Sequence, residues 1–236
     1  MTLPAEPRVA SSADLGLRRR EGHCRRAGLL LAAVAAVISL GGVPARQAVA
    51  LEPCGPDVGG YRQFLLAELT RRTPGRIVAA FIAMPSFTPE YGVLLSEVAG
   101  RMAVYRLSFD RSVWNASVVE SAPGTFTHRF TRAIAPGKSR HAALARDLAT
   151  RLQALLAAEL SSPKPSAAGG LDGETYQFTV GAQCAQTWSP QARTREDFLV
   201  RRFEEAGALV ALSGHQRDVA ERDLRGKLDA YRAAPQ

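Results

Sequence analysis

The chain has 236 residues, of which 46% are hydrophobic, 22% charged and 7% aromatic, and its formal net charge is +8. This composition excludes a disordered acidic tail, a collagen-like repeat and a polytopic membrane protein. The length fits one domain, or one domain preceded by a processed segment.

The first fifty residues follow the order of a secretory signal peptide. Residues 1–26 are polar and basic, residues 27–40 form an uncharged apolar run, and the small residues A-V-A end at Ala50. We therefore expect cleavage near Ala50 and export to the periplasm or the medium. The alternative is a membrane anchor over residues 27–44, but the apolar run is shorter than the roughly 20 residues that a spanning helix needs.

Removal of residues 1–50 lowers the positive charge of the chain. This segment holds 7 of the 30 basic and 3 of the 22 acidic residues, which leaves 23 bases, 19 acids and a net charge of +4. No basic run with interleaved aromatic residues occurs, so a nucleic-acid partner is not expected. The arginines are interpreted as a solvated surface with at most weak attraction to anionic envelope polymers.

Two cysteines remain after cleavage, Cys54 and Cys184. Thiols pair in an oxidising compartment, and two cysteines allow one intramolecular bond. We therefore predict a Cys54–Cys184 disulfide that joins the new N-terminus to a late strand. Two separate buried thiols are the alternative. No Cys or His spacing typical of zinc occurs, so neither a metal nor a cofactor is expected.

The order of the expected elements predicts the α+β class. A short helix over 58–72 precedes segments of strand length, and these are 76–83, 91–97, 101–109, 112–120 and 125–134. The short turns between them favour an antiparallel meander. A leucine stripe then predicts one long amphipathic helix over 139–160, with His141 in its first turn, and the sheet is expected to pack on this helix.

The remaining chain predicts a loop, a strand and two helices. Residues 161–170 are small, Pro or Lys, and an Asp-Gly turn at Asp172 opens a strand. Two further C-terminal helices are expected over 195–212 and 216–233. The predicted organisation is a signal peptide over 1–50, a single α+β domain over 51–214 and a charged helical extension over 215–236.

Two stretches contain most of the residues that can bind or react: residues 85–91, and residues 171–176 taken with 186–190. Turn and core roles explain many of them. A cleft between the two stretches is predicted to be lined by Glu90, Glu174, Tyr176, Gln186 and Trp188. Two carboxylates perform acid and base catalysis only where they converge at a suitable separation.

His128 lies between Phe126 and Phe130, which is typical of a half-buried structural histidine. No nucleophile elbow, phosphate loop or dinucleotide fingerprint occurs in the sequence. The leading hypothesis is an exported, non-catalytic protein that binds a partner protein or an envelope component. The alternative is a small hydrolase-like enzyme that uses Glu90 or Glu174 with His128.

Three short motifs carry a resemblance to small exported bacterial proteins of uncharacterised function. The motifs are L-D-G-E-T-Y-x-F at 171–178, Q-T-W-S-P at 186–190 and L-V-A-L at 209–212. The resemblance covers about residues 76–214 and leaves the charged tail outside. It implies an envelope location and assigns neither an activity nor a catalytic residue.

Overall fold

The computed structural model of the chain describes residues 51–134, 136–164 and 172–233. The predicted signal peptide with its cleavage site at Ala50 and residues 165–171, which include most of the predicted loop, lie outside these ranges. None of the helices within the described ranges combines the length and the apolar character that a membrane span requires.

Seven antiparallel strands form one sheet, in the order β1-β9-β8-β2-β3-β4-β7. The chain adds β2, β3, β4 and β7 side by side and then returns to the free side of β2 with β8 and β9. The predicted α+β class with an antiparallel sheet is therefore confirmed. The strands are β1 (Glu52–Pro53), β2 (Arg76–Pro85), β3 (Tyr91–Val98), β4 (Arg101–Phe109), β7 (Pro136–Ala143), β8 (Glu174–Val180) and β9 (Gln183–Trp188).

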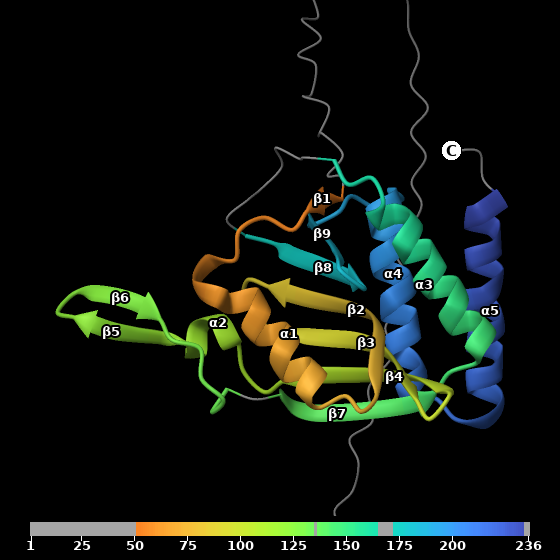
Figure 1. Cartoon of the computed structure of the whole chain (residues 1–236), viewed down its shortest axis with the longest axis horizontal. Coiled ribbons are helices and arrows are strands. Elements are labelled where there is room, and N and C mark those ends of the chain that lie inside the picture. The colour runs from red at the N-terminus through yellow and green to blue at the C-terminus, as the bar shows by residue number, and fades with distance from the viewer. Residues whose placement is uncertain (1–50, 135, 165–171, 234–236) are drawn as a thin grey trace, which may run out of the picture. The chain divides into compact units, whose positions relative to one another are not determined.

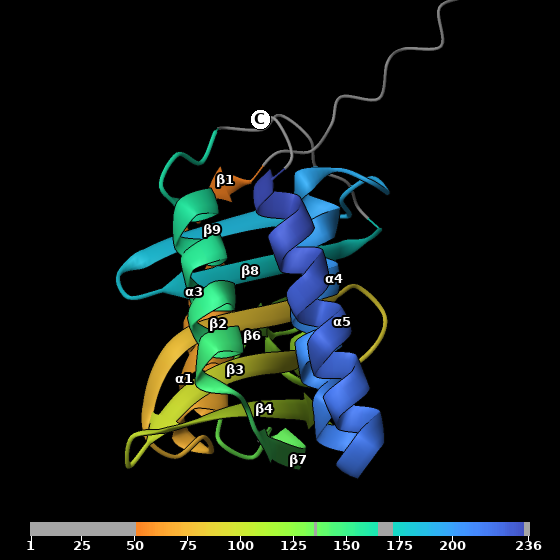
Figure 2. The ribbon, with the colours of Figure 1, turned by 90° about the vertical axis from the view of Figure 1, so that its right-hand side faces the viewer.

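Helices cover both faces of the sheet (Figure 1). Helix α1 lies on one face, and α3, α4 and α5 lie on the other, which Figure 2 shows facing the viewer. Helix α5 buries Leu224 and Leu228 in the same core as α3 and α4. The helices are α1 (Tyr61–Arg71), α2 (Val113–Ala116), α3 (Arg146–Leu160), α4 (Arg195–Ala208) and α5 (Gly214–Ala233), with single 3₁₀ turns η1 (Val58–Gly60) and η2 (Leu209–Ala211).

Alternation along the strands supplies two hydrophobic cores, because successive side chains of a strand point to opposite faces. Phe81 of β2 packs with Phe178 and Phe203 on the three-helix face. Its neighbour Ile82 lies in the second core with Leu65 of α1. The α1 face and the three-helix face are therefore separate environments. Whether a strand residue occupies an odd or an even position along its strand decides which face its side chain points to.

A two-stranded hairpin, β5 (Val118–Ala122) and β6 (Thr125–His128), forms a second sheet that extends away from the first (Figure 1). The predicted strand over 112–120 is wrong in its first half, where α2 forms. The hydroxyl of Ser112 accepts the N–H of Asn115 and caps this helix, and such caps compete with strand pairing. The strand predicted over 125–134 ends at His128.

Two further corrections concern β7 and β9. The helix predicted over 139–160 begins at Arg146, and residues up to Ala143, His141 included, form β7. Alanine and arginine favour helix locally, but pairing with β4 overrides this propensity. Strand β9 was not predicted, because its sequence Q-C-A-Q-T-W has few β-branched residues; a turn with Gly181 at positive φ pairs it with β8.

The predicted Cys54–Cys184 disulfide is confirmed, with Cα atoms 5.5 Å apart across 130 residues of sequence. It joins the residue after β1 to the second residue of β9, next to the pairs that Glu52 and Pro53 form with Gln186 and Ala185. Leu51, the first residue after the predicted cleavage site, is buried in the core of the three-helix face. The two-residue strand β1 is thus held by a covalent bond as well as by pairing.

Candidate functional site

A cleft of about 500 Å³ lies on the α1 face of the sheet. It is bounded by the segment that leads into α1, by α2 and by the loop between β2 and β3. Seven of its fourteen lining residues are apolar or aromatic, and the other seven are polar or charged. The lining residues are Pro56, Asp57, Val58, Tyr61, Arg62, Met84, Pro85, Ser86, Phe87, Trp114, Asn115, Asp172, Thr175 and Gln186.

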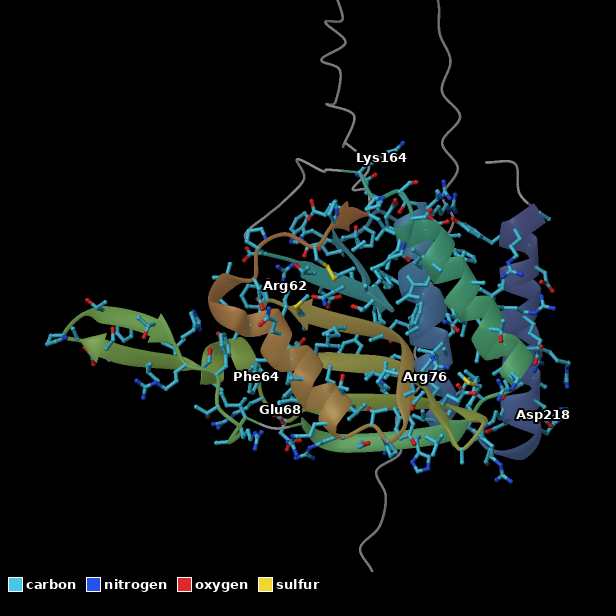
Figure 3. All side chains as sticks on the ribbon, in the orientation of Figure 1. Arg62, Phe64, Glu68, Arg76, Lys164 and Asp218 are labelled. Carbon is cyan, nitrogen blue, oxygen red and sulfur yellow. A yellow bond between two sulfur atoms is a disulfide. The ribbon has the colours of Figure 1, made fainter. Side chains whose placement is uncertain are left out.

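The first wall of the cleft is fixed by the start of α1. The carboxylate of Asp57 accepts the N–H groups of Arg62 and Gln63, both at 2.9 Å, and so satisfies two free donors of the helix N-terminus. The guanidinium of Arg62, which Figure 3 shows near the beginning of α1, donates to the side chain of Gln186 and to the carbonyl of Gly55. Arg62 therefore ties α1 to β9.

The second wall is made where the two predicted stretches meet. The N–H and the hydroxyl of Ser86 donate to the carbonyl of Gly173, at 3.0 and 2.8 Å, and the N–H of Gly173 donates back to the Ser86 hydroxyl at 3.2 Å. This loop-to-loop contact holds the neighbouring Phe87 at the rim, where its side chain is 76% exposed. Residues from both stretches line this cleft: Ser86 and Phe87 come from the first, and Asp172, Thr175 and Gln186 from the second.

Glu90 lies behind the wall of the cleft and is 0% exposed. Its carboxylate accepts the hydroxyl of Tyr61 at 2.5 Å and the N–H groups of Val113 and Trp114 at 2.7 and 3.1 Å. The donors offset the cost of burying this carboxylate. Burial, together with the Glu90 carboxylate, raises the pKa of the Tyr61 phenol well above its usual range. Glu90 therefore orients Tyr61 and Trp114, which face the cleft.

His128 lies at the base of the hairpin, half-buried against Trp114 with ring centroids 3.7 Å apart. Its Nδ1 is 2.8 Å from the hydroxyl of Ser117, and that hydroxyl donates to the carbonyl of Trp114 at 2.7 Å. Because the Ser117 hydroxyl proton points at the Trp114 carbonyl, the hydrogen bond between Ser117 and His128 needs a proton from His128. We therefore assign Nδ1–H of His128 as the donor and the Ser117 oxygen as the acceptor. This arrangement is the reverse of a histidine that accepts a proton from a serine nucleophile.

The other predicted residues are divided between the two faces of the sheet. Glu174 and Tyr176 lie on the three-helix face, where Tyr176 stacks on Phe81 and donates its hydroxyl to Glu174. Burial and the Glu174 carboxylate raise the pKa of Tyr176. Gln186 and Trp188 lie on the α1 face, and Trp188 packs so closely on Gly173 that a Cβ there would lie 2.7 Å from the indole. Of the five predicted cleft residues, Gln186 alone lines the cleft.

Two aromatic residues that line the cleft were not predicted as site residues. Tyr61 belongs to the apolar spacing that predicted α1, and Trp114 lies in a segment predicted as a strand, so both appeared to be core residues. Both side chains are half-buried, and no signal in the sequence separates them from core residues. Within the described ranges the large exposed hydrophobic side chains are Val58, Phe87, Val118, Phe126 and Val219, and the first four lie at the cleft or on the hairpin.

Within the same ranges, no group of three or more His, Cys, Asp or Glu side chains is placed to hold a metal ion. A scan against protein-family models found no match to the chain, and searches of curated proteins and of solved structures found no significant match. The geometry of the described residues is therefore the basis for the function proposed below.

Proposed function

We propose that this chain is an exported protein that binds a segment of a partner protein through a continuous surface made of the cleft and the β5–β6 hairpin. The observation that carries the proposal is that four large exposed hydrophobic side chains lie at the cleft, as Val58 and Phe87 do, or on the hairpin, as Val118 and Phe126 do. Exposed apolar patches on soluble domains commonly mark interaction sites. The cleft volume also falls in the range of about 300–1,000 Å³ typical of ligand sites.

Side-chain contacts connect the cleft to the hairpin. Trp114 lines the cleft and stacks on His128 of β6. His128 pairs with Val118, and Phe126 pairs with Glu120, so Val118, Phe126 and His128 share one face of the hairpin. This face and the cleft therefore meet at Trp114. Aromatic side chains in such positions are frequent anchors of binding energy.

A protein segment is the occupant that best fits the composition of this surface. Seven apolar or aromatic side chains line the cleft together with seven polar or charged ones, among them Ser86, Asn115, Asp172 and Gln186. Protein–protein interfaces usually combine apolar contacts with about as many hydrogen-bonding groups as such a mixed lining offers. The hairpin adds length to this surface, because a two-stranded sheet with exposed side chains has no core of its own to bury.

Export is supported by two features. The order of residues 1–50 is that of a cleaved signal peptide, and the Cys54–Cys184 bond is compatible with an oxidising compartment. The resemblance to exported bacterial proteins points the same way and remains part of the proposal. The hydrolase alternative has less support, because Glu90 is surrounded by donors and Glu174 lies on the face opposite the cleft.

Binding of the uncharged dye Nile red tests for an accessible apolar site in the cleft. The Trp188→Phe variant leaves Trp114 as the single tryptophan that can transfer energy to the dye, since the chain has two. We expect saturable binding with energy transfer, weakened about tenfold by Phe87→Ser, which corresponds to about 1.4 kcal/mol for a lost apolar anchor.

The matched control is Val219→Ser, which removes an exposed valine from α5. It should leave dye affinity unchanged. Non-saturable binding, or equal losses in the Phe87 and Val219 variants, would contradict an apolar binding site at the cleft. Near-UV circular dichroism of each variant verifies that the fold is retained.

A further inference from the structure

A second cavity, of about 370 Å³, lies on the three-helix face between the edge of the sheet and the end of α4. Strands β4 and β7 provide its basic floor, and α4 with η2 provides a wall of small apolar residues. It is separated from the cleft by the sheet. The lining residues are Arg106, Ser108, Lys138, Arg140, Gly207, Ala208, Val210 and Ala211.

Strand register brings the positive charges of this cavity together. Arg106 of β4 lies directly opposite Arg140 of β7, and Ser108 lies opposite Lys138. Side chains directly opposite in an antiparallel pair have Cβ atoms about 5 Å apart, and like charges in such positions destabilise the sheet. Three cations therefore share one small area at the last strand of the sheet.

The negative charge next to these cations is insufficient to balance them. Glu204 of α4 accepts from Arg106 at 3.0 Å and also from the hydroxyl of Tyr91, over whose ring the Arg106 guanidinium lies at 4.8 Å. The side chains of Lys138 and Arg140 are exposed, and neither has an ion-pair or hydrogen-bond partner within the described part of the chain. The C-terminal end of α4 adds only partial negative charge from its carbonyl groups.

We propose that this cavity binds a dianionic phosphate group carried by a small molecule or a lipid headgroup. Glu204 balances one of the three cations, which leaves two positive charges for one dianion. The guanidinium of Arg140 offers a fork that suits phosphate oxygens, and Lys138 and Ser108 add donors. The wall of Ala208, Val210 and Ala211 would contact the apolar part of the ligand.

The helix wall stands close to the floor because of Gly207. A Cβ at this position would lie 2.6 Å from a methyl group of Val93 and 3.3 Å from the Arg106 guanidinium. This close approach keeps Arg106 beneath α4, whereas Lys138 and Arg140 line the cavity from the edge strand β7 and are exposed. The proposed phosphate site is thus independent of the apolar cleft and goes beyond the function proposed for it.

The test uses inorganic phosphate and glycerol phosphate, titrated against the purified protein at constant ionic strength. Binding is followed through the guanidinium N–H signals of Arg106 and Arg140 by NMR. We expect these signals to shift in a saturable way. The double substitution Lys138→Gln with Arg140→Gln should weaken binding at least about tenfold, because both uncompensated cations are lost.

Two further variants distinguish a built site from general positive charge. Arg101→Gln removes a cation from the same strand β4 but on the α1 face, and it should leave affinity unchanged. Glu204→Gln should strengthen binding several-fold, because it removes the carboxylate that competes for Arg106. Equal weakening by Arg101→Gln, or no gain from Glu204→Gln, would overturn the proposal.

Vesicles distinguish the two sources of the phosphate. Vesicles with phosphatidic acid in phosphatidylcholine are compared with vesicles of phosphatidylcholine alone. Sedimentation with the first kind, lost in the Lys138 and Arg140 double variant, assigns a lipid headgroup. Saturable binding of glycerol phosphate without sedimentation assigns a soluble phosphate ester. Absence of both kinds of binding would refute the site.

Discussion

The main sheet and the β5–β6 hairpin are both antiparallel, yet they differ in what covers them. In β2 eight of ten side chains are buried between α1 and the three-helix layer, whereas all but two of the nine side chains in β5 and β6 are exposed. The hairpin is joined to the body through Trp114, Ser117 and His128 at its base. The comparison shows that strand pairing alone does not decide the role of a sheet: the covered sheet supplies stability, and the uncovered one supplies surface.

The largest expected contrast is between two phenylalanines. Phe81 is 0% exposed and contacts the rings of Tyr91, Tyr176, Phe178 and Phe203. Phe81→Ala should lower the free energy of unfolding by about 3–5 kcal/mol, because a cavity remains in the core. Phe126→Ala in β6, where the ring is 66% exposed, should change it by less than about 0.5 kcal/mol. Urea unfolding measures the change in unfolding free energy for both variants. Equal losses would contradict the contrast between the covered sheet and the uncovered hairpin.

Loss of the disulfide should destabilise the main sheet and leave the hairpin unaffected. Replacing Cys54 and Cys184 with Ser should lower the free energy of unfolding by about 2–5 kcal/mol, since the bond closes a long loop. Residues 51–60 should become sensitive to protease, because β1 pairs with β9 through two residues only. Limited proteolysis with mass spectrometry identifies the cleavage sites. New cleavage within 118–128, with 51–60 still resistant, would contradict this assignment.

Removal of the Glu90 carboxylate should loosen the base of the hairpin. Glu90→Ala leaves the N–H groups of Val113 and Trp114 and the hydroxyl of Tyr61 without their acceptor. We expect a loss of about 1–3 kcal/mol and faster hydrogen exchange over residues 112–130. Glu174→Ala is the matched control, because its partner Tyr176 lies on the other face of the sheet. Similar exchange in both variants would contradict a local role for Glu90.

The smallest expected effect concerns alkaline pH. Burial and the Glu90 carboxylate raise the pKa of Tyr61 in the folded chain, whereas an unfolded tyrosine ionises near pH 10. The folded state therefore keeps its proton longer, and this contribution to stability is present below about pH 10 and is lost as the pH rises above it. Tyr61→Phe should make the decline of unfolding free energy between about pH 9 and pH 11 shallower. An unchanged decline would mean that the Tyr61 proton is not coupled to folding.

The sequence predicted the fold best where pattern and environment agree. β4 alternates along its length between two neighbouring strands, and α5 buries Leu224 and Leu228 four residues apart, so both were predicted nearly to their ends. The strand β7 was missed because Ser139, Arg140, His141 and Ala142 carry no strand signal, and its partner β4 decides the conformation. Such pairing is a tertiary effect that local propensity does not contain.

The site was less predictable than the fold, for a different reason. Residue type indicated Glu90 and Glu174 as site residues. Hydrogen bonds from residues distant in sequence hold Glu90 behind the cleft. The alternation of side chains along β8 places Glu174 on the other face of the sheet. Phe87 and Trp114 are ordinary apolar residues in sequence, and only their place in the lining of a shared cleft distinguishes them. The role of a residue here depends on which neighbours the topology brings to it.

If the cleft and the hairpin together form one binding surface, site-specific photo-crosslinking in the intact host should attach the same partner to both. The crosslinking residue p-benzoylphenylalanine replaces Phe87 at the cleft, Phe126 on the hairpin or, as the control, Val219 on α5, all of which are exposed. We expect adducts of one shared mass from the Phe87 and Phe126 positions and no such adduct from the Val219 position. The crosslinks from the first two positions should map to one segment of one partner protein. Unrelated adducts from the first two positions, or the same adduct from all three, would contradict it.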